Sequence, residues 1–431
     1  MNGETILLQQ IRIIDPTESK DYVADVLVVG GQIHAIEAQI TNYPSNTQII
    51  PSSDLILGTG LVDLYSHSGE PGAEARETLH SLAASAAAGG FTEVAVLPDT
   101  TPAIDNLEIL TSLQQKTSQF KNNAHPSLSQ LHFWTALSIG KETKHLTELA
   151  QLSDRAIGFF QRLSFADLPL FKQALEYLQP LQKPIAIDLS QNQLTDNGLM
   201  REGIESIRYG LVGNPDYSET AAIAAILEIV ASLSTPVHIM RVSTARGVEL
   251  IAEAKRRGVP VTASTTWMHL LFSTKELKTY NPNLRLEPPL GNQHDLKALQ
   301  QGIKTGTLDA IAIDHHSYTY EEKTVPFALS PPGAIGLELA LPILWQTLVT
   351  ANILSPIQLW QALSLKPRVC LQQPPSQVNN SHSSHLTLFA PQKTWFVNSQ
   401  NTYSLGTNTF WWEREITGKV IPWNSVKDAI A

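Results

Sequence analysis

The sequence contains very little cysteine and comparatively little charge. Cys370 is the single cysteine among 431 residues, so no disulfide can form within the chain. Charged residues make up only 16%, against roughly 25% in an average soluble protein, whereas hydrophobic residues make up 42%. This balance predicts a globular chain with a large buried core and argues against extended disorder.

The sequence also lacks an excess of basic residues, a secretory signal and a long apolar run. Lys and Arg number 30 against 40 Asp and Glu, giving a formal net charge of −10, so we expect no nucleic-acid partner. The opening MNGETILLQQ lacks the basic and apolar regions of a signal peptide. No stretch approaches the ~18 apolar residues that span a bilayer. We therefore expect a cytoplasmic protein with no membrane partner.

From about residue 55 onward, short apolar runs alternate with helix-like segments. The runs FTEVAVLPD, PIAIDLS, PVHIMRVS, PVTASTT and DAIAIDHH each end in polar residues, and segments such as ETAAIAAILEIVASL separate them. This pattern is typical of buried parallel strands in βα units. We predict an α/β fold in which residues 56–371 form a (β/α)8 TIM barrel, with its chemistry at the C-terminal ends of the strands.

Strand patterns flank this region at both ends of the chain. ETILLQQIRII and VADVLVVGGQIHAIEAQI come first, with Gly30 and Gly31 at a hairpin position. A Pro-, Ser- and Asn-rich linker near residue 372 precedes LTLFAPQKTWFV and ITGKVIPW. We predict that residues 1–55 and 372–431 form one small composite β-sandwich, in which Trp411 and Trp412 pack.

Seven segments, in order and at the right spacing, resemble dihydroorotase of the amidohydrolase superfamily. They are GLVDLYSHSGEPG at 60–72, GGFTEVAVLPDTTPAIDN at 89–106, LMREGIESIRYGL at 199–211, HIMRVSTARGVELIAEAKRRGVPVTAS at 238–264, NPNLRLEPPLG at 281–291, IAIDHHSYTYEEK at 311–323 and SPPGAIGLELALPIL at 330–344. The resemblance implies a barrel flanked by a composite sandwich. It also implies an ancestral activity that opens a cyclic amide with metal-activated water.

The resemblance places metal-binding histidines where this chain has other residues. The family's Asp-x-His-x-His reads Asp63-Leu64-Tyr65-Ser66-His67 here, so Tyr65 replaces one histidine and His67 remains. Two further histidines fall on Asp188 and Arg241, and the next ligand falls near Gln161 and Arg162. A guanidinium keeps its charge and has no lone pair for a metal, so we expect no metal cofactor.

Asp314 is the one family acid/base that is retained, and we expect it to be non-functional without a metal. Substrate recognition has changed as well. Gly69 stands where the family has an arginine that clamps a carboxylate, Asp99 replaces an asparagine, and Tyr318 replaces a histidine. An ion pair of Arg241 with Asp314 or Asp188 is expected in place of the metal. The alternative is that Arg241 turns out to solvent.

Turn-forming residues such as Gly60, Gly72, Gly89 and Pro98 persist while reactive groups are lost. We interpret the chain as a catalytically inactive, dihydroorotase-like protein of pyrimidine biosynthesis that acts as a structural or regulatory partner or as a homo-oligomer. The resemblance suggests aspartate transcarbamoylase as the partner. One alternative is an active cyclic amidohydrolase with a rebuilt zinc site of His67, Asp188 and Asp314. Another is a small-molecule binding protein that uses the barrel mouth.

Overall fold

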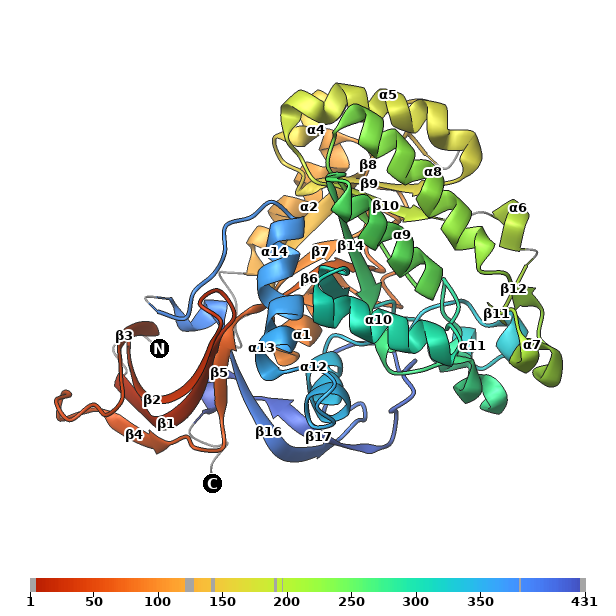
Figure 1. Ribbon diagram of the computed structural model, residues 1–431. Coiled ribbons are helices and arrows are strands. Elements are labelled where there is room, and N and C mark those ends of the chain that lie inside the picture. The colour runs from red at the N-terminus through yellow and green to blue at the C-terminus, as the bar shows by residue number, and fades with distance from the viewer. Residues whose placement is uncertain are drawn as a thin grey trace.

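Eight parallel strands form the barrel and confirm the predicted TIM-barrel fold (Figure 1). The computed structural model describes residues 5–120, 128–140, 144–189, 192–195, 197–379 and 381–426. Around the barrel the strands lie in the order β15, β14, β13, β10, β9, β8, β7 and β6. Their bounds are Leu61–Ser66 (β6), Phe91–Val96 (β7), Gln130–Ala136 (β8), Gly158–Leu163 (β9), Ile185–Leu189 (β10), Val237–Ile239 (β13), Val261–Thr266 (β14) and Ala310–Ala312 (β15).

The barrel closes between β6 and β15 through individual hydrogen bonds. The N–H of Asp314 donates to the carbonyl of Tyr65 at 3.1 Å, and the N–H of His67 donates to the carbonyl of His315 at 2.8 Å. The carboxylate of Asp63 accepts from the N–H of Ile313 at 2.8 Å. These bonds fix the strand ends that carry Tyr65 and Asp314 against one another.

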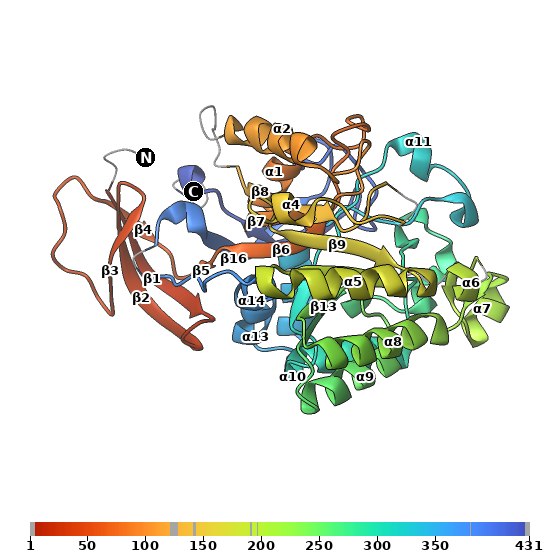
Figure 2. The ribbon, with the colours of Figure 1, turned by 90° about the horizontal axis from the view of Figure 1, so that it is seen from above.

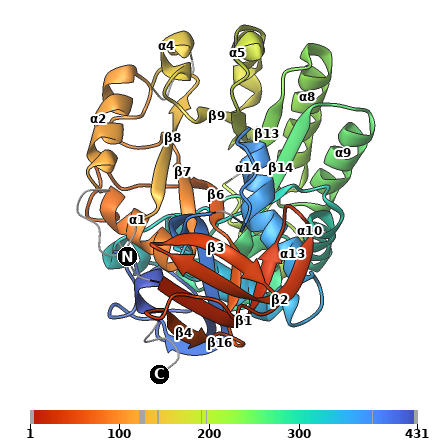
Figure 3. The ribbon, with the colours of Figure 1, turned by 90° about the vertical axis from the view of Figure 1, so that its left-hand side faces the viewer.

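Helices cover the outside of the barrel, and α2, α4, α5, α8 and α9 fan around one side of it in Figure 3. The longer helices are α1 (Leu79–Ala88), α2 (Leu107–Ser118), α5 (Leu168–Leu178), α8 (Tyr217–Leu233), α9 (Ala245–Arg256) and α10 (Gln293–Thr305). Short helices are α4 (Leu149–Ser153), α6 (Asn192–Thr195), α7 (Ile204–Tyr209), α11 (Tyr320–Lys323), α12 (Ala340–Leu344), α13 (Pro356–Trp360) and α14 (Lys366–Cys370). In the described ranges, no helix has the length and apolar character needed to cross a bilayer.

Strands from both ends of the chain share one seven-stranded sheet, as predicted for the composite sandwich (Figure 2). Its order is β17, β16, β5, β1, β2, β3, with β4 paired to β1. Their bounds are Thr5–Asp15 (β1), Lys20–Val29 (β2), Gln32–Glu37 (β3), Gln48–Pro51 (β4), Ile56–Thr59 (β5), Leu386–Phe396 (β16) and Glu415–Val420 (β17). Gly30 and Gly31, both at positive φ, form the turn between β2 and β3. The chain passes from β5 directly into barrel strand β6 through Gly60.

The segment between β16 and β17 leaves the sheet and crosses to the mouth of the barrel. There the ring of Trp411 stacks on Trp267, with centroids 5.2 Å apart. The expectation that Trp411 packs inside the sandwich is therefore wrong, because its stacking partner follows barrel strand β14. The side-chain amide of Asn408 donates to the carbonyls of His316 and Gly333, at 2.9 and 3.2 Å.

Candidate functional site

The C-terminal ends of the barrel strands surround a small cavity of about 180 Å³. Residues at the C-terminal ends of β6, β7, β9, β13, β14 and β15, or within three residues after them, line it. Polar groups dominate this lining, which includes His67, Asp99, Arg162, Arg241, Glu287 and Asp314. The cavity is the position at which TIM-barrel enzymes carry their chemistry.

The guanidinium of Arg241 occupies the centre of this group and forks onto two carboxylates. Its Nε and Nη2 donate to the two oxygens of Asp314 at 2.9 and 2.5 Å, and its Nη1 donates to Asp188 at 2.7 Å. Arg241 is only 3% exposed. Such a buried, two-pronged contact is the strongest form of charge-assisted hydrogen bonding between side chains. Arg241 therefore points inward and does not turn out to solvent.

Two arginines share the carboxylate of Asp188. At the end of β10, its Oδ2 accepts from Arg241 and, at 2.9 Å, from the Nε of Arg162 on β9. The side chain of Arg162 is half exposed, whereas that of Asp188 is buried. Residues 161 and 162 were expected near a ligand position, and the structure assigns Arg162 to this second contact. Gln161 lies beside it and accepts from Ser138 at 2.9 Å.

Tyr65 contacts both the backbone and the guanidinium of Arg241. Its phenol oxygen accepts from the backbone N–H of Arg241 at 3.1 Å and lies 3.1 Å from the hydroxyl of Ser264. The guanidinium carbon lies 5.3 Å from the centre of the Tyr65 ring, within range of a cation–π contact. Burial raises the pKa of Tyr65 above its ordinary value, so the phenol stays neutral. Arg241 itself has a positive φ of 54°, so its backbone as well as its side chain needs this support.

His67 lies between two carboxylates beside the guanidinium. Its Nδ1 is 2.6 Å from Asp99, and its Nε2 is 3.3 Å from Asp314 and 3.1 Å from the Nη2 of Arg241. Burial lowers the pKa of His67, but Asp99 and Asp314 outweigh it and raise the pKa to about 9. Each nitrogen of the imidazole therefore lies within ion-pair distance of one carboxylate. Its ring also stacks on His316, with centroids 3.9 Å apart.

The charges of the site stabilise one another. Burial alone would raise the pKa of Asp314, yet Arg241 and His67 hold that pKa well below its ordinary value. Burial likewise opposes the charge on Arg241, while Asp314 and Asp188 hold its pKa well above the ordinary value. Asp314 is therefore an ion-pair acceptor at neutral pH, with little tendency to take up a proton.

At Gly69 the backbone leaves no room for a side chain. A Cβ built at Gly69 would lie 2.3 Å from the carbonyl oxygen of Ala73 and 2.5 Å from that of Glu77. An arginine at this position would require the loop to move. The carboxylate of Asp99 is likewise committed to His67, as described above.

Tyr318 closes the cavity from one side by stacking on His316, with ring centroids 4.4 Å apart. Its hydroxyl donates to the carbonyl of Pro332 at 3.0 Å. Burial raises the pKa of the phenol above its ordinary value. This neutral phenol therefore lines the cavity, and its hydroxyl hydrogen is already used in the bond to Pro332.

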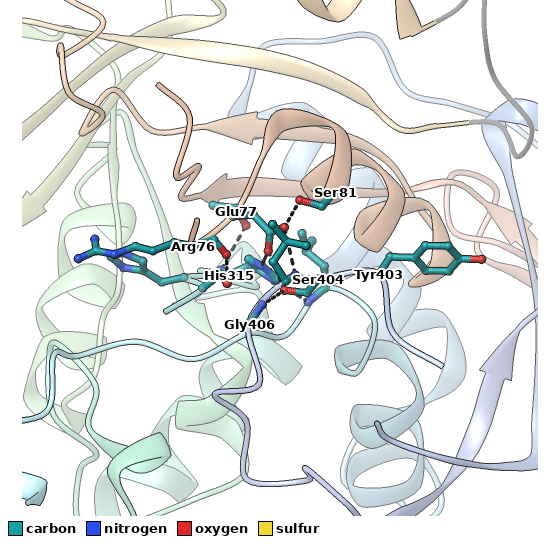
Figure 4. A network of polar contacts seen from close by, with 12 residues as sticks. Arg76, Glu77, Ser81, His315, Tyr403, Ser404 and Gly406 are labelled. Atoms are coloured by element: carbon teal, nitrogen blue, oxygen red, sulfur yellow. Dashed lines mark hydrogen bonds and ion pairs between the residues drawn. The ribbon is translucent and has the colours of Figure 1, made fainter. Parts of the chain in front are cut away.

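A buried carboxylate ties the crossing segment to the barrel mouth (Figure 4). Glu77, which is 1% exposed, accepts from the hydroxyl of Ser404 at 2.7 Å and lies 3.2 Å from the Nε2 of His315. The hydroxyl of Ser81 donates to its other oxygen. We call residues 403–408 the mouth strap. Sequence reasoning missed its bond to Glu77, which joins residues 327 positions apart.

The residues at this point do not fit a metal ion. A divalent cation held by His67, Asp188 and Asp314 would have to share their lone pairs with a permanently charged guanidinium. Among the residues that the structure describes, no group of three or more His, Cys, Asp and Glu is arranged to hold a metal. The donor atoms that could have bound one are directed at Arg241 instead.

Comparisons of the sequence with known proteins all find relatives of one family. A family described as dihydro-orotase-like matches residues 54–246. A "probable dihydroorotase-like protein" of Synechocystis sp. is 43% identical, and the match covers 98% of this chain and all of that one. A dihydroorotase of Syntrophus aciditrophicus is 34% identical, with 96% of each chain covered.

Solved structures of similar fold are hydantoinases. An L-hydantoinase from Arthrobacter aurescens superimposes with a TM-score of 0.81 at 19% identity, covering 98% of this chain and 95% of its own. A D-hydantoinase from Thermus sp. gives a TM-score of 0.77 at 20% identity, covering 96% of this chain and 93% of its own. At such identities the likeness concerns the fold alone.

Proposed function

This chain belongs to the dihydroorotase-like family of pyrimidine metabolism, and we propose that it is a non-catalytic member, which serves pyrimidine biosynthesis by associating with a partner protein. The observation that carries the proposal is the fork of Arg241 onto Asp188 and Asp314. Metal-assisted hydrolysis draws several kcal/mol of transition-state stabilisation from the ion and its bound hydroxide. In this chain a guanidinium, which can neither bind nor generate hydroxide, takes the contacts of the two carboxylates.

The retained acid/base position supports the same conclusion. A general base works best when its pKa is near the working pH and its oxygen can reach the reacting proton. Asp314 has a pKa held below its ordinary value, and Arg241 engages both of its oxygens. To act as a base, Asp314 would first have to break a buried ion pair.

Recognition of an anionic substrate is also weakened. The closed backbone at Gly69 excludes a carboxylate-binding arginine, and Asp99 presents a negative charge toward the cavity. A cavity of about 180 Å³ is smaller than the roughly 300 Å³ at which small-molecule sites begin. The space left around the ion pairs therefore suits a packed end of a barrel better than a substrate pocket.

The decisive test is elemental analysis of the purified chain together with dihydroorotate turnover. We expect less than about one transition metal per chain after dialysis against a chelator, since a stable zinc site needs three or four protein ligands. We expect no turnover above the buffer blank. Stoichiometric zinc with turnover would restore the alternative of a rebuilt site of His67, Asp188 and Asp314.

The family resemblance makes aspartate transcarbamoylase the candidate partner. Co-expression with the transcarbamoylase of the same organism, followed by size-exclusion chromatography, should give one co-eluting complex. A transcarbamoylase that is fully active alone, beside a free chain of this protein, would contradict the partnership. It would leave binding of a small molecule as the function to pursue.

A further inference from the structure

The short helix α7 carries its apolar side chains on the outside. Ile204 is 71% exposed and Ile207 is 85% exposed, whereas Ser206 between them is buried. The two isoleucines are three positions apart, so they are neighbours on one face of the helix. A surface helix normally turns its apolar face toward the core. The reversed arrangement in α7 is typical of a helix whose apolar face is covered by another protein.

Further exposed apolar side chains lie at the C-terminal end of α7. Val212, which follows that end, is 50% exposed, and Tyr280 is 45% exposed. The hydroxyl of Tyr280 donates to the carbonyl of Tyr209 at 2.6 Å, which holds Tyr280 beside the last turn of the helix. Single exposed apolar residues are ordinary, but a group of them marks a contact surface. We call Ile204, Ile207, Val212 and Tyr280 the α7 ridge.

The α7 ridge is accessible at the edge of the molecule. In Figures 1 and 2, α7 lies at the end of the molecule opposite the N-terminal strands β1, β2 and β3. The ridge also shares no residue with the Arg241 cluster or the mouth strap. A second protein can therefore reach it without displacing either the sandwich or the groups at the barrel mouth.

The two ends of the α7 ridge carry opposite charges. Glu202 and Glu205 stand at the N-terminal end of α7. Arg208 lies in the last turn of the helix, and Lys278 is two residues before Tyr280. Within the described ranges, none of these four charged side chains is used in an ion pair of the chain itself. All four are available to a partner.

This distribution makes the α7 ridge complementary to itself. A two-fold axis beside the middle of α7 would set the helices of two copies antiparallel, with the acidic end of each against the basic end of the other. Glu205 and Arg208 are three positions apart and neighbours on the helix surface, so each can face the other residue in the second copy. A partner surface of one charge would be repelled at one of the two ends. The ridge therefore fits a second copy of this chain better than a uniformly charged partner.

We propose that α7 lies at the centre of a two-fold interface between two copies of this chain. Ile204 and Ile207 of one protomer pack on the same two residues of its partner, and Glu205 of each protomer pairs with Arg208 of the other. The proposal goes beyond the proposed function, because it concerns the chain alone. Failure of the dimer would leave the metal analysis and the transcarbamoylase test unaffected, and the reverse also holds.

Sedimentation velocity of the purified full chain tests the proposal. Between about 1 and about 200 µM protein, we expect a shift from one chain to two, with a Kd below about 100 µM. I207D should raise that Kd at least about tenfold, because it places a carboxylate in the apolar centre of the interface. I139D is the matched control, at an isoleucine after β8 that is 54% exposed, and should leave the Kd unchanged. Circular dichroism verifies that each variant is folded.

Charge reversal tests the antiparallel orientation. E205R and R208E each bring like charges together and should raise the Kd at least about tenfold. An equimolar mixture of E205R and R208E should restore the dimer, because every arginine at these positions then faces a glutamate.

A wild-type chain that stays monomeric over this range overturns the proposal, as does a dimer that persists in I207D or a mixture that stays monomeric. A monomeric wild-type chain that co-elutes with aspartate transcarbamoylase, but loses it in I207D, would assign the ridge to that partner instead.

Discussion

The phenol oxygen of Tyr65 holds the backbone of Arg241 through a hydrogen bond of 3.1 Å. Both residues stand where the resemblance places metal-binding histidines. Tyr65 lies on β6 and Arg241 follows β13, so the bond joins two strands of the barrel through residues 176 positions apart. The two substitutions are therefore physically coupled, and a change at one position should be felt at the other.

Tyr65→Phe removes only the hydroxyl that bonds to Arg241 and Ser264. We expect a loss of about 1–3 kcal/mol in the free energy of unfolding, because the N–H of Arg241 is left buried without a partner. Urea unfolding measures it. Tyr177→Phe, at a side chain that is 52% exposed, is the matched control and should change stability little. Equal effects at the two sites would show that the buried hydroxyl contributes nothing.

Arg241→Met leaves Asp188 and Asp314 facing each other without their shared cation. We expect a destabilisation of about 3–5 kcal/mol by urea unfolding, since removing one member of a buried ion pair strands the other charge. Arg246→Met breaks an exposed pair with Glu249 and serves as the control. If Arg241→Met proved as mild as Arg246→Met, the fork would be structurally unimportant.

Tyr65→His restores one family histidine and should yield no dihydroorotase activity. Groups that act as a unit give almost nothing when restored singly, and Arg241 still occupies the contacts of both carboxylates. Turnover of dihydroorotate with added zinc is the measurement. Activity above the wild-type background from this single change would mean that Arg241 does not block catalysis at this site.

Glu77→Ala removes the carboxylate that joins His315 and Ser404. We expect a loss of about 2–4 kcal/mol, because His315 is fully buried and loses this charged partner. Chymotrypsin, which can cut after Tyr403 and Leu405, should then cleave the mouth strap faster than in the wild-type chain. Glu74→Ala, at a fully exposed position nearby, should leave the cleavage rate unchanged. Unaltered cleavage in Glu77→Ala would show that this carboxylate does not hold the mouth strap in place.

Glu338 should make stability fall as the pH rises. Burial, with a smaller contribution from Glu77, raises its folded-state pKa from 4.5 to about 7, although hydrogen bonds from Ser404 and Tyr403 oppose the rise. Between those values the folded chain holds a proton that the unfolded chain has released, so the contribution of Glu338 is lost as the pH passes through 7. Glu338→Gln should gain up to about 3 kcal/mol relative to wild type between pH 4.5 and 8, measured by urea unfolding. A difference in the free energy of unfolding between Glu338→Gln and wild type that does not change with pH would refute the raised pKa of Glu338.

The barrel and the composite sheet could be predicted because their signals are local. Runs such as PIAIDLS carry the length and apolar character of buried strands, and strands of both ends flank the barrel region. The meeting of Arg241 with Asp188 and Asp314 could be anticipated because parallel strand ends converge at one face of a barrel. Whether the chain binds a metal or a partner stays a prediction.

Other features had no local signal. The contact of Ser404 with Glu77 depends on the path of a loop that returns from the far end of the chain. The sequence shows that position 69 lacks an arginine, but only the folded backbone shows that Ala73 and Glu77 close over it. Trp411 was expected inside the sandwich because buried aromatic rings usually fill a core, yet its ring stacks on Trp267 of the barrel.

The pairing of β16 with β5 has a consequence for how the protein is made. Leu386 pairs with Thr59 and Phe389 with Ile56, so an early strand waits for a partner that the ribosome adds more than 300 residues later. Until then β5 has an unpaired edge, which is the kind of edge that recruits other chains. The sheet can be completed only after β16 has been synthesised, and until then nascent chains of this protein should depend on chaperones.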